Sequence, residues 1–173
     1  MATLFVCFCI SPDILLDNRA ISLYGSEPRT VAPYALGLLG SAYLIFKTSR
    51  SLPKDNSTNQ ALSKCLCILA GLIVGLTATP YTLNSVLFYV HATFAFSLFL
   101  FELGLGFWLM LKARRDVIDI ILFTGQAAGF TISMLSLGEI KVLHLLVVGQ
   151  LITVWMFALL LTRAVYRIEG NKK

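Results

Sequence analysis

Two ionisable side chains, His91 and Glu102, lie inside one long apolar stretch, residues 84–112. At about 3.6 residues per turn they fall on one face of a helix, roughly three turns apart. An ionised carboxylate facing lipid costs roughly 3 kcal/mol or more. We therefore expect Glu102 to face other helices, a partner or a water-filled cleft, and to be either neutral or hydrogen-bonded to a neighbouring helix.

Further polar residues recur at membrane depth. Asp119, Gln126 and Ser133 are seven residues apart, which places them on one side of a helix, and Gln150 lies inside the last apolar stretch. The predicted polar intramembrane stripe consists of His91, Glu102, Asp119, Gln126 and Gln150. Two interpretations fit it: hydrogen bonds that join helices, or a polar path through a small transporter or channel subunit, lined by Glu102, Asp119, Gln126 and His91.

Signatures of catalysis are absent from the sequence. It contains no phosphate-binding glycine loop, no G-x-S-x-G and no H-E-x-x-H motif. His91 and His144 could in principle supply two axial haem ligands, but no C-x-x-C-H attachment motif accompanies them. We expect no enzyme activity, no metal and no cofactor.

The four cysteines form two C-x-C pairs, Cys7 with Cys9 and Cys65 with Cys67. This spacing differs from the C-x-x-C of thiol oxidoreductases and of common zinc sites. We interpret all four as ordinary apolar cysteines without a functional disulfide.

Composition places the chain among membrane proteins, because 57% of its 173 residues are hydrophobic and only 13% are charged. Basic residues outnumber acidic ones by 14 to 9. They flank apolar segments, so membrane orientation and anionic lipid headgroups explain them better than nucleic acid does. The expected partners are membrane lipids and other membrane proteins or a second copy of the chain, with no nucleic acid.

The apolar segments predict an all-α bundle of six membrane spans in a single domain, residues 1–173. The predicted spans are about 2–16, 31–47, 65–80, 84–112, 117–137 and 142–163. The first is shorter than the roughly 20 residues that a span needs, and Pro12 and Asp13 interrupt it. A half-inserted segment or a signal peptide is also open there, and five spans is the alternative.

Two G-x-x-x-G patterns predict close helix packing. Gly71 and Gly75 lie in the third predicted span, and Gly125 and Gly129 lie in the fifth. Small residues at this spacing let a neighbouring backbone approach closely.

The distribution of Lys and Arg predicts the orientation. Eleven of them fall on one side of the predicted spans, namely Lys47, Arg50, Lys54, Lys64, Lys112, Arg114, Arg115, Arg163, Arg167, Lys172 and Lys173. Only Arg19, Arg29 and Lys141 fall on the other. Since the basic side of a membrane protein stays inside, the C-terminus is predicted to be cytoplasmic.

The layout resembles the Frag/DRAM/Sfk family and the related bacterial six-helix domains of unknown function. The resemblance rests on an I-S-x-x-G motif in the first outer loop, Ile21–Gly25, and on His91 near the start of the fourth span. Leu23 stands where the family usually has an acidic residue. The resemblance implies a non-catalytic integral membrane protein associated with lipid homeostasis and trafficking, and it carries over only Ser22, Gly25 and His91.

Overall fold

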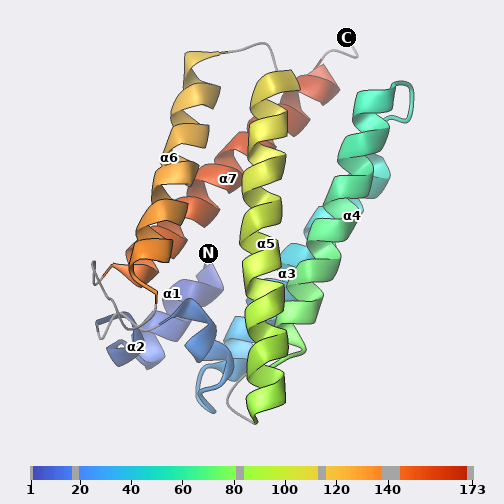
Figure 1. The fold of residues 1–173 in the computed structure, drawn as a ribbon. Coiled ribbons are helices and arrows are strands. Elements are labelled where there is room, and N and C mark those ends of the chain that lie inside the picture. Colours follow the sequence, from blue (N-terminus) through green and yellow to red (C-terminus); the bar gives the residue numbers. More distant parts are fainter. Residues whose placement is uncertain (1, 17–19, 81–83, 113–115, 138–144, 171–173) are drawn as a thin grey trace. The chain divides into compact units, whose positions relative to one another are not determined.

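The computed structural model describes residues 2–16, 20–80, 84–112, 116–137 and 145–170, and within these ranges it is helical with no strand (Figure 1). Five helices are long and apolar enough to cross a membrane. They are α3 (Val31–Ser51), α4 (Ser57–Thr77), α5 (Ser85–Lys112), α6 (Val117–Leu135) and α7 (Leu146–Gly170). This confirms the all-α membrane fold, and the chain is a multi-pass membrane protein.

The N-terminal segment forms two short helices, α1 (Ala2–Ile10) and α2 (Asp13–Leu16). Pro12 lies between them; it has no N–H to donate, and its ring disfavours helical geometry at the residue before it. Neither helix approaches the roughly 20 residues needed to cross a bilayer. The predicted first span is therefore replaced by two short helices, and the spans that the structure describes match the five-span alternative.

The chain groups into two compact units. One comprises Met1–Asp17 and Ser22–Phe99, and the other comprises Asn18–Ile21 and Leu100–Lys173. Helix α5 contributes its first half to one unit and its second half to the other. The predicted single domain stays a prediction.

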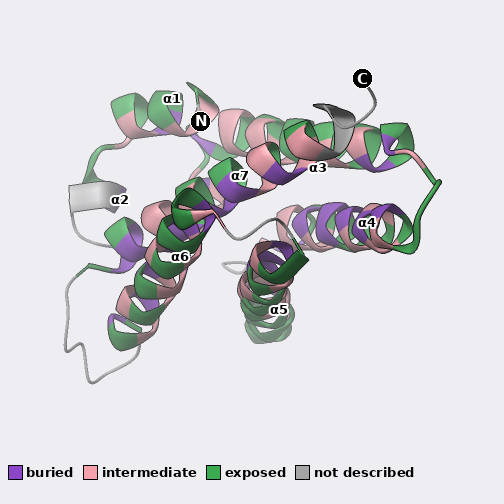
Figure 2. Cartoon of the chain, turned by 90° about the horizontal axis from the view of Figure 1, so that it is seen from above, coloured by how far each residue is buried: buried purple, intermediate pink, exposed green. Residues whose placement is uncertain are grey.

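In the first unit α3 and α4 pack side by side, and α1 packs on α3 (Figure 1). Helix α4 begins at the cap Asn56, whose side chain accepts a hydrogen bond from the backbone N–H of Asn59. Its buried residues follow the three- and four-residue spacing of one helix face (Figure 2): Asn59, Leu62, Leu66, Leu69, Ala70 and Ile73. An amphipathic pattern thus packs α4, although the whole helix is apolar enough to lie in a membrane.

In the second unit α6 and α7 pack side by side (Figure 1), and their backbones approach each other closely at two glycines. A Cβ at Gly129 would lie 2.7 Å from the backbone nitrogen of Thr153, and a Cβ at Gly149 would lie 2.7 Å from the carbonyl oxygen of Gly129. Real side chains do not reach such distances, so only glycine allows this crossing. Gly125 is also packed, against Met156.

The other G-x-x-x-G pattern has a different outcome. A Cβ at Gly75 would overlap the ring of Phe94 on α5, so a side chain and not a backbone fills the space that Gly75 leaves. Gly71 is exposed, and nothing lies within 4 Å of the Cβ that it would carry. The structure therefore assigns Gly71 no packing contact, although it lies one turn before Gly75 on α4.

Candidate functional site

The polar residues with the clearest potential for binding are Glu102 on α5 and Gln126 on α6. Glu102 is 6% exposed and Gln126 is 0% exposed. One turn after Glu102, Gly106 leaves a space on α5 that the side-chain amide of Gln126 fills, since a Cβ at Gly106 would overlap the amide oxygen. Gln126 therefore belongs to the packed interface between α5 and α6, and Glu102 is buried one turn before Gly106 on the same face of α5.

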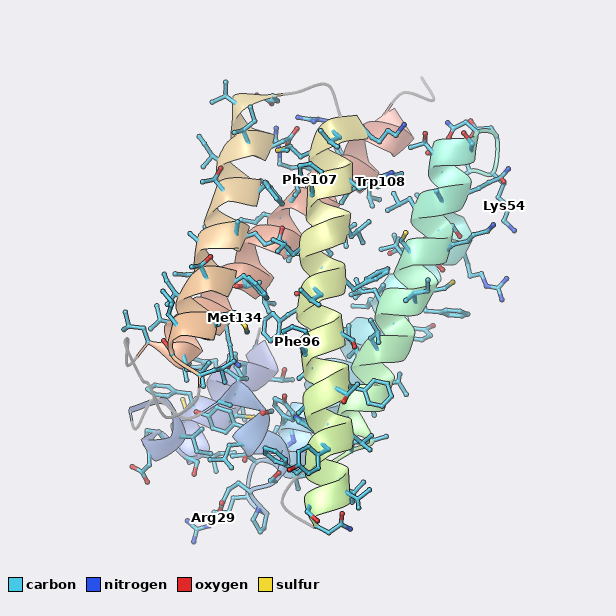
Figure 3. The ribbon with its side chains drawn as sticks, viewed as in Figure 1. Arg29, Lys54, Phe96, Phe107, Trp108 and Met134 are labelled. Atoms are coloured by element: carbon cyan, nitrogen blue, oxygen red, sulfur yellow. The ribbon has the colours of Figure 1, made fainter. Side chains whose placement is uncertain are left out.

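An aromatic contact also joins α5 to α6, at the residue after Gly106. Phe107 points from α5 toward α6, and its ring centroid lies 5.6 Å from that of Phe123 (Figure 3). Leu105 and Leu109 on α5 and Leu122 on α6 are buried as well. The surroundings of Glu102 and Gln126 are thus apolar and aromatic, as expected of a site at membrane depth.

The polar atoms of this pair are not satisfied by the described residues. Glu102 Oε2 and both polar atoms of the Gln126 amide, Oε1 and Nε2, are buried without a hydrogen-bond partner there. Buried polar groups are nearly always hydrogen-bonded, and each unsatisfied one costs roughly 1–3 kcal/mol. The pair thus offers both donors and acceptors to a bound molecule.

Asp119, which we had placed in the same stripe, is engaged inside the protein. It is 1% exposed and accepts hydrogen bonds from two arginines of α7. Arg163 Nε lies 3.1 Å from Asp119 Oδ1, and Arg167 Nη1 donates to Asp119 Oδ2. Asp116 completes the cluster with Oδ2 at 2.9 Å from Arg163 Nη2 and 3.1 Å from Arg167 Nη2. Two carboxylates and two guanidinium groups therefore join α6 to α7 and balance each other's charge.

Arg163 and Arg167 were not predicted as partners of Asp119, and their positive charge served only as evidence of orientation. A signal was present: Arg163 and Arg167 are four residues apart, and Asp116 and Asp119 are three apart, so each pair lies on one helix face. Asp116 has a second role as the N-cap of α6, because its side chain accepts from the backbone N–H of Ile118 at 3.3 Å.

His91 also has an internal partner. Its side chain is buried, and Nδ1 lies 2.6 Å from the carbonyl oxygen of Thr79 at the end of α4, so Nδ1–H is the donor. This bond joins α4 to α5 within the first unit. The geometry supports the structural interpretation of His91.

Gln150 was predicted as part of the polar stripe, but its side chain has a different partner. It is half-buried, and its amide oxygen accepts a hydrogen bond from the backbone N–H of Ile21 at 3.0 Å. The reason is local: Ile21 begins a 3₁₀ helix, Ile21–Gly25, and the first N–H groups of such a turn have no partner within it. Gly25 packs against the ring of Tyr34, where a Cβ would lie 2.9 Å from Cδ1, and Ser22 is half-buried.

Among the described residues, no group of three or more His, Cys, Asp and Glu side chains could hold a metal ion. All four cysteines are free, and only Cys7 of them is buried. His144, considered above as a haem ligand, lies outside the described residues.

Comparison with models of protein families, with curated proteins and with solved structures found no match for this chain. Inferences about function therefore rest on the residues and contacts described above.

Proposed function

We propose that this chain is a non-catalytic integral membrane protein with a lipid-associated role, acting through its helix surfaces. One observation carries the proposal: large apolar side chains cover the outside of every span, while Asp119, His91 and Gln150 have hydrogen-bond partners inside the protein. The exposed set includes Leu36 and Tyr43 on α3, Ile68 and Val74 on α4, Phe88 and Phe96 on α5, Ile121 on α6 and Leu159 on α7. Such surfaces contact acyl chains or membrane partners.

The alternative of transport has weaker support. Two of the four residues suggested for its path have internal partners, since Asp119 pairs with arginines and His91 binds the Thr79 carbonyl. Catalysis has weaker support still, because no set of nucleophile and base is recognisable in the sequence. The resemblance to Frag/DRAM/Sfk proteins belongs to this proposal and adds the association with lipid homeostasis.

Lipid dependence tests the proposed role. Protein purified in mild detergent should unfold at a lower temperature after thorough delipidation, and added bilayer lipid should restore the original value, because acyl chains cover the exposed apolar faces. The detergent and its concentration are the same in all samples, so that only the lipid content changes. A midpoint unaffected by both treatments would contradict a lipid-associated role.

Fluorescence provides a direct test of lipid contact. Trp155 on α7 is exposed, whereas Trp108 on α5 is half-buried, and the chain has no other tryptophan. In bilayers whose acyl chains carry bromine, the bromine should strongly quench the fluorescence of Trp155, the tryptophan that remains in Trp108→Phe. Trp155→Phe is the matched variant and should be quenched less. Equal, weak quenching in both would show that this face of α7 does not meet lipid.

The proposed cytoplasmic C-terminus rests on the distribution of basic residues. In a variant whose native cysteines are replaced by serine, Ser57→Cys at the start of α4 should resist an impermeant thiol reagent in intact cells. Pro28→Cys should react readily, because residue 28 is exposed and lies on the other side of α3. The reverse pattern would invert the orientation.

A further inference from the structure

The unsatisfied atoms of Glu102 and Gln126 define a specific set of hydrogen-bonding requirements. A primary amide places one acceptor, Oε1, beside one donor, Nε2. Two-point pairing with it needs a group that holds a donor and an acceptor at the same spacing. A neutral carboxyl group has this geometry; an ester lacks the donor, and a single hydroxyl cannot align with both atoms.

Glu102 completes the requirement. Among the described residues Glu102 forms no ion pair with Arg, Lys or His, and the two arginines of α7, Arg163 and Arg167, are paired with Asp116 and Asp119. A carboxyl group in such apolar surroundings is expected to be neutral and so to donate one hydrogen bond. The carbonyl oxygen of an incoming carboxyl group has two lone pairs, one for Gln126 Nε2 and one for Glu102.

The rest of the ligand must be apolar. Glu102 and Gln126 lie within the long apolar helices α5 and α6, next to the Phe107–Phe123 contact. The outer faces of both helices expose large apolar side chains such as Leu100 and Ile121. A ligand that reaches these atoms must therefore come from the lipid phase, with its polar head group at Glu102 and Gln126 and its apolar part among apolar side chains.

We propose that Glu102 and Gln126 form a binding site for the neutral carboxyl group of a long-chain fatty acid. The ligand O–H donates to Gln126 Oε1, and its carbonyl oxygen accepts from Gln126 Nε2 and from Glu102. This assignment satisfies all three buried atoms with one group. Gly106 is a positioning residue, because its missing side chain lets the Gln126 amide lie against α5.

The experiment uses the full chain in lipid nanodiscs and a photoactivatable palmitic acid that carries a diazirine in its chain. The pH is mildly acidic, where a membrane-embedded fatty acid is largely neutral. Cross-linking should map to peptides of α5 and α6. Unlabelled palmitic acid should compete at least about tenfold better than methyl palmitate, which has the same chain but no donor. This comparison needs no variant of the protein.

Variants then assign the residues. Gln126→Leu, which has similar size but no polar atoms, should weaken binding about tenfold or more. Gln60→Leu is the matched control on the exposed start of α4 and should bind like the wild type. Glu102→Gln keeps a donor and should bind within a few-fold of the wild type.

Several results would overturn the site: no cross-linking, cross-links confined to other helices, equal competition by acid and ester, or full affinity in Gln126→Leu. Equal competition would point to acyl-chain contact alone, or to Glu102 and Gln126 being satisfied by water or by each other. The proposed lipid-associated role is judged separately by delipidation. Destabilisation by delipidation together with equal competition would keep that role and reject this site.

Discussion

Replacing Gly129 with alanine should push α6 and α7 apart. The added Cβ would lie 2.7 Å from the backbone nitrogen of Thr153 and 2.9 Å from the carbonyl oxygen of Gly149. Both are backbone atoms in the first turns of α7, so no side-chain rotation can relieve the overlap. The helices must separate along the crossing or bend.

The expected size follows from two opposing effects. Overpacking a tight interface costs about 1–3 kcal/mol, and a clash with rigid backbone belongs at the upper end. Alanine is also the better helix former, which returns up to about 1 kcal/mol. The net prediction is a loss of about 2 kcal/mol for Gly129→Ala.

Gly104 on α5 is the matched control. Nothing lies within 4 Å of the Cβ that it would carry, so Gly104→Ala keeps the gain in helix propensity without a clash. The same chemical change should thus have opposite effects at the two positions. Gly149→Ala should behave like Gly129→Ala, because its Cβ would lie 2.7 Å from the Gly129 carbonyl oxygen and from the Ser133 backbone nitrogen.

Thermal unfolding of the purified variants in one detergent measures these effects. For a chain of this size about 1 kcal/mol corresponds to about 2–4 °C. Gly129→Ala should therefore unfold about 4–8 °C below the wild type, and Gly104→Ala at or slightly above it. If Gly129→Ala is as stable as the wild type, or if the two variants shift in the same direction, the reasoning about the α6–α7 crossing is refuted.

Asp119→Asn should lower the free energy of unfolding by about 1–3 kcal/mol, because it leaves two partly buried arginines with one carboxylate. Asp116→Asn should cost below about 1 kcal/mol, because Asp116 is more exposed. Equal unfolding temperatures of the two variants would contradict this ranking. Burial, assisted by the neighbouring Cys7, raises the pKa of the Tyr24 hydroxyl, which donates to the Ser11 carbonyl oxygen at 3.3 Å. The stabilising contribution of this hydroxyl should be complete below the unfolded pKa of about 10 and be lost as the pH rises through the raised pKa of the folded state. The unfolding temperature of the wild type should therefore exceed that of Tyr24→Phe by less at alkaline pH. A difference that does not change with pH would contradict this prediction.

The sequence by itself determined the class of fold, because the length of an apolar segment decides whether a helix can cross a membrane. Residues 84–112 illustrate this, since α5 extends from Ser85 to Lys112. Periodicity was similarly informative: the seven-residue spacing of Asp119, Gln126 and Ser133 placed them on one helix face, and all three are buried. These features depend only on helix geometry and on hydrophobicity.

Tertiary structure decided which partner each polar residue has. One polar stripe separated into an ion-paired Asp119, a Gln126 seated against Gly106, and a Glu102 with an unsatisfied oxygen. Likewise Gly71 and Gly129 share a sequence pattern, yet only Gly129 meets another backbone. Spacing along a helix places a residue on a face, but the residue opposite that face comes from another helix, and only packing between helices brings the two together.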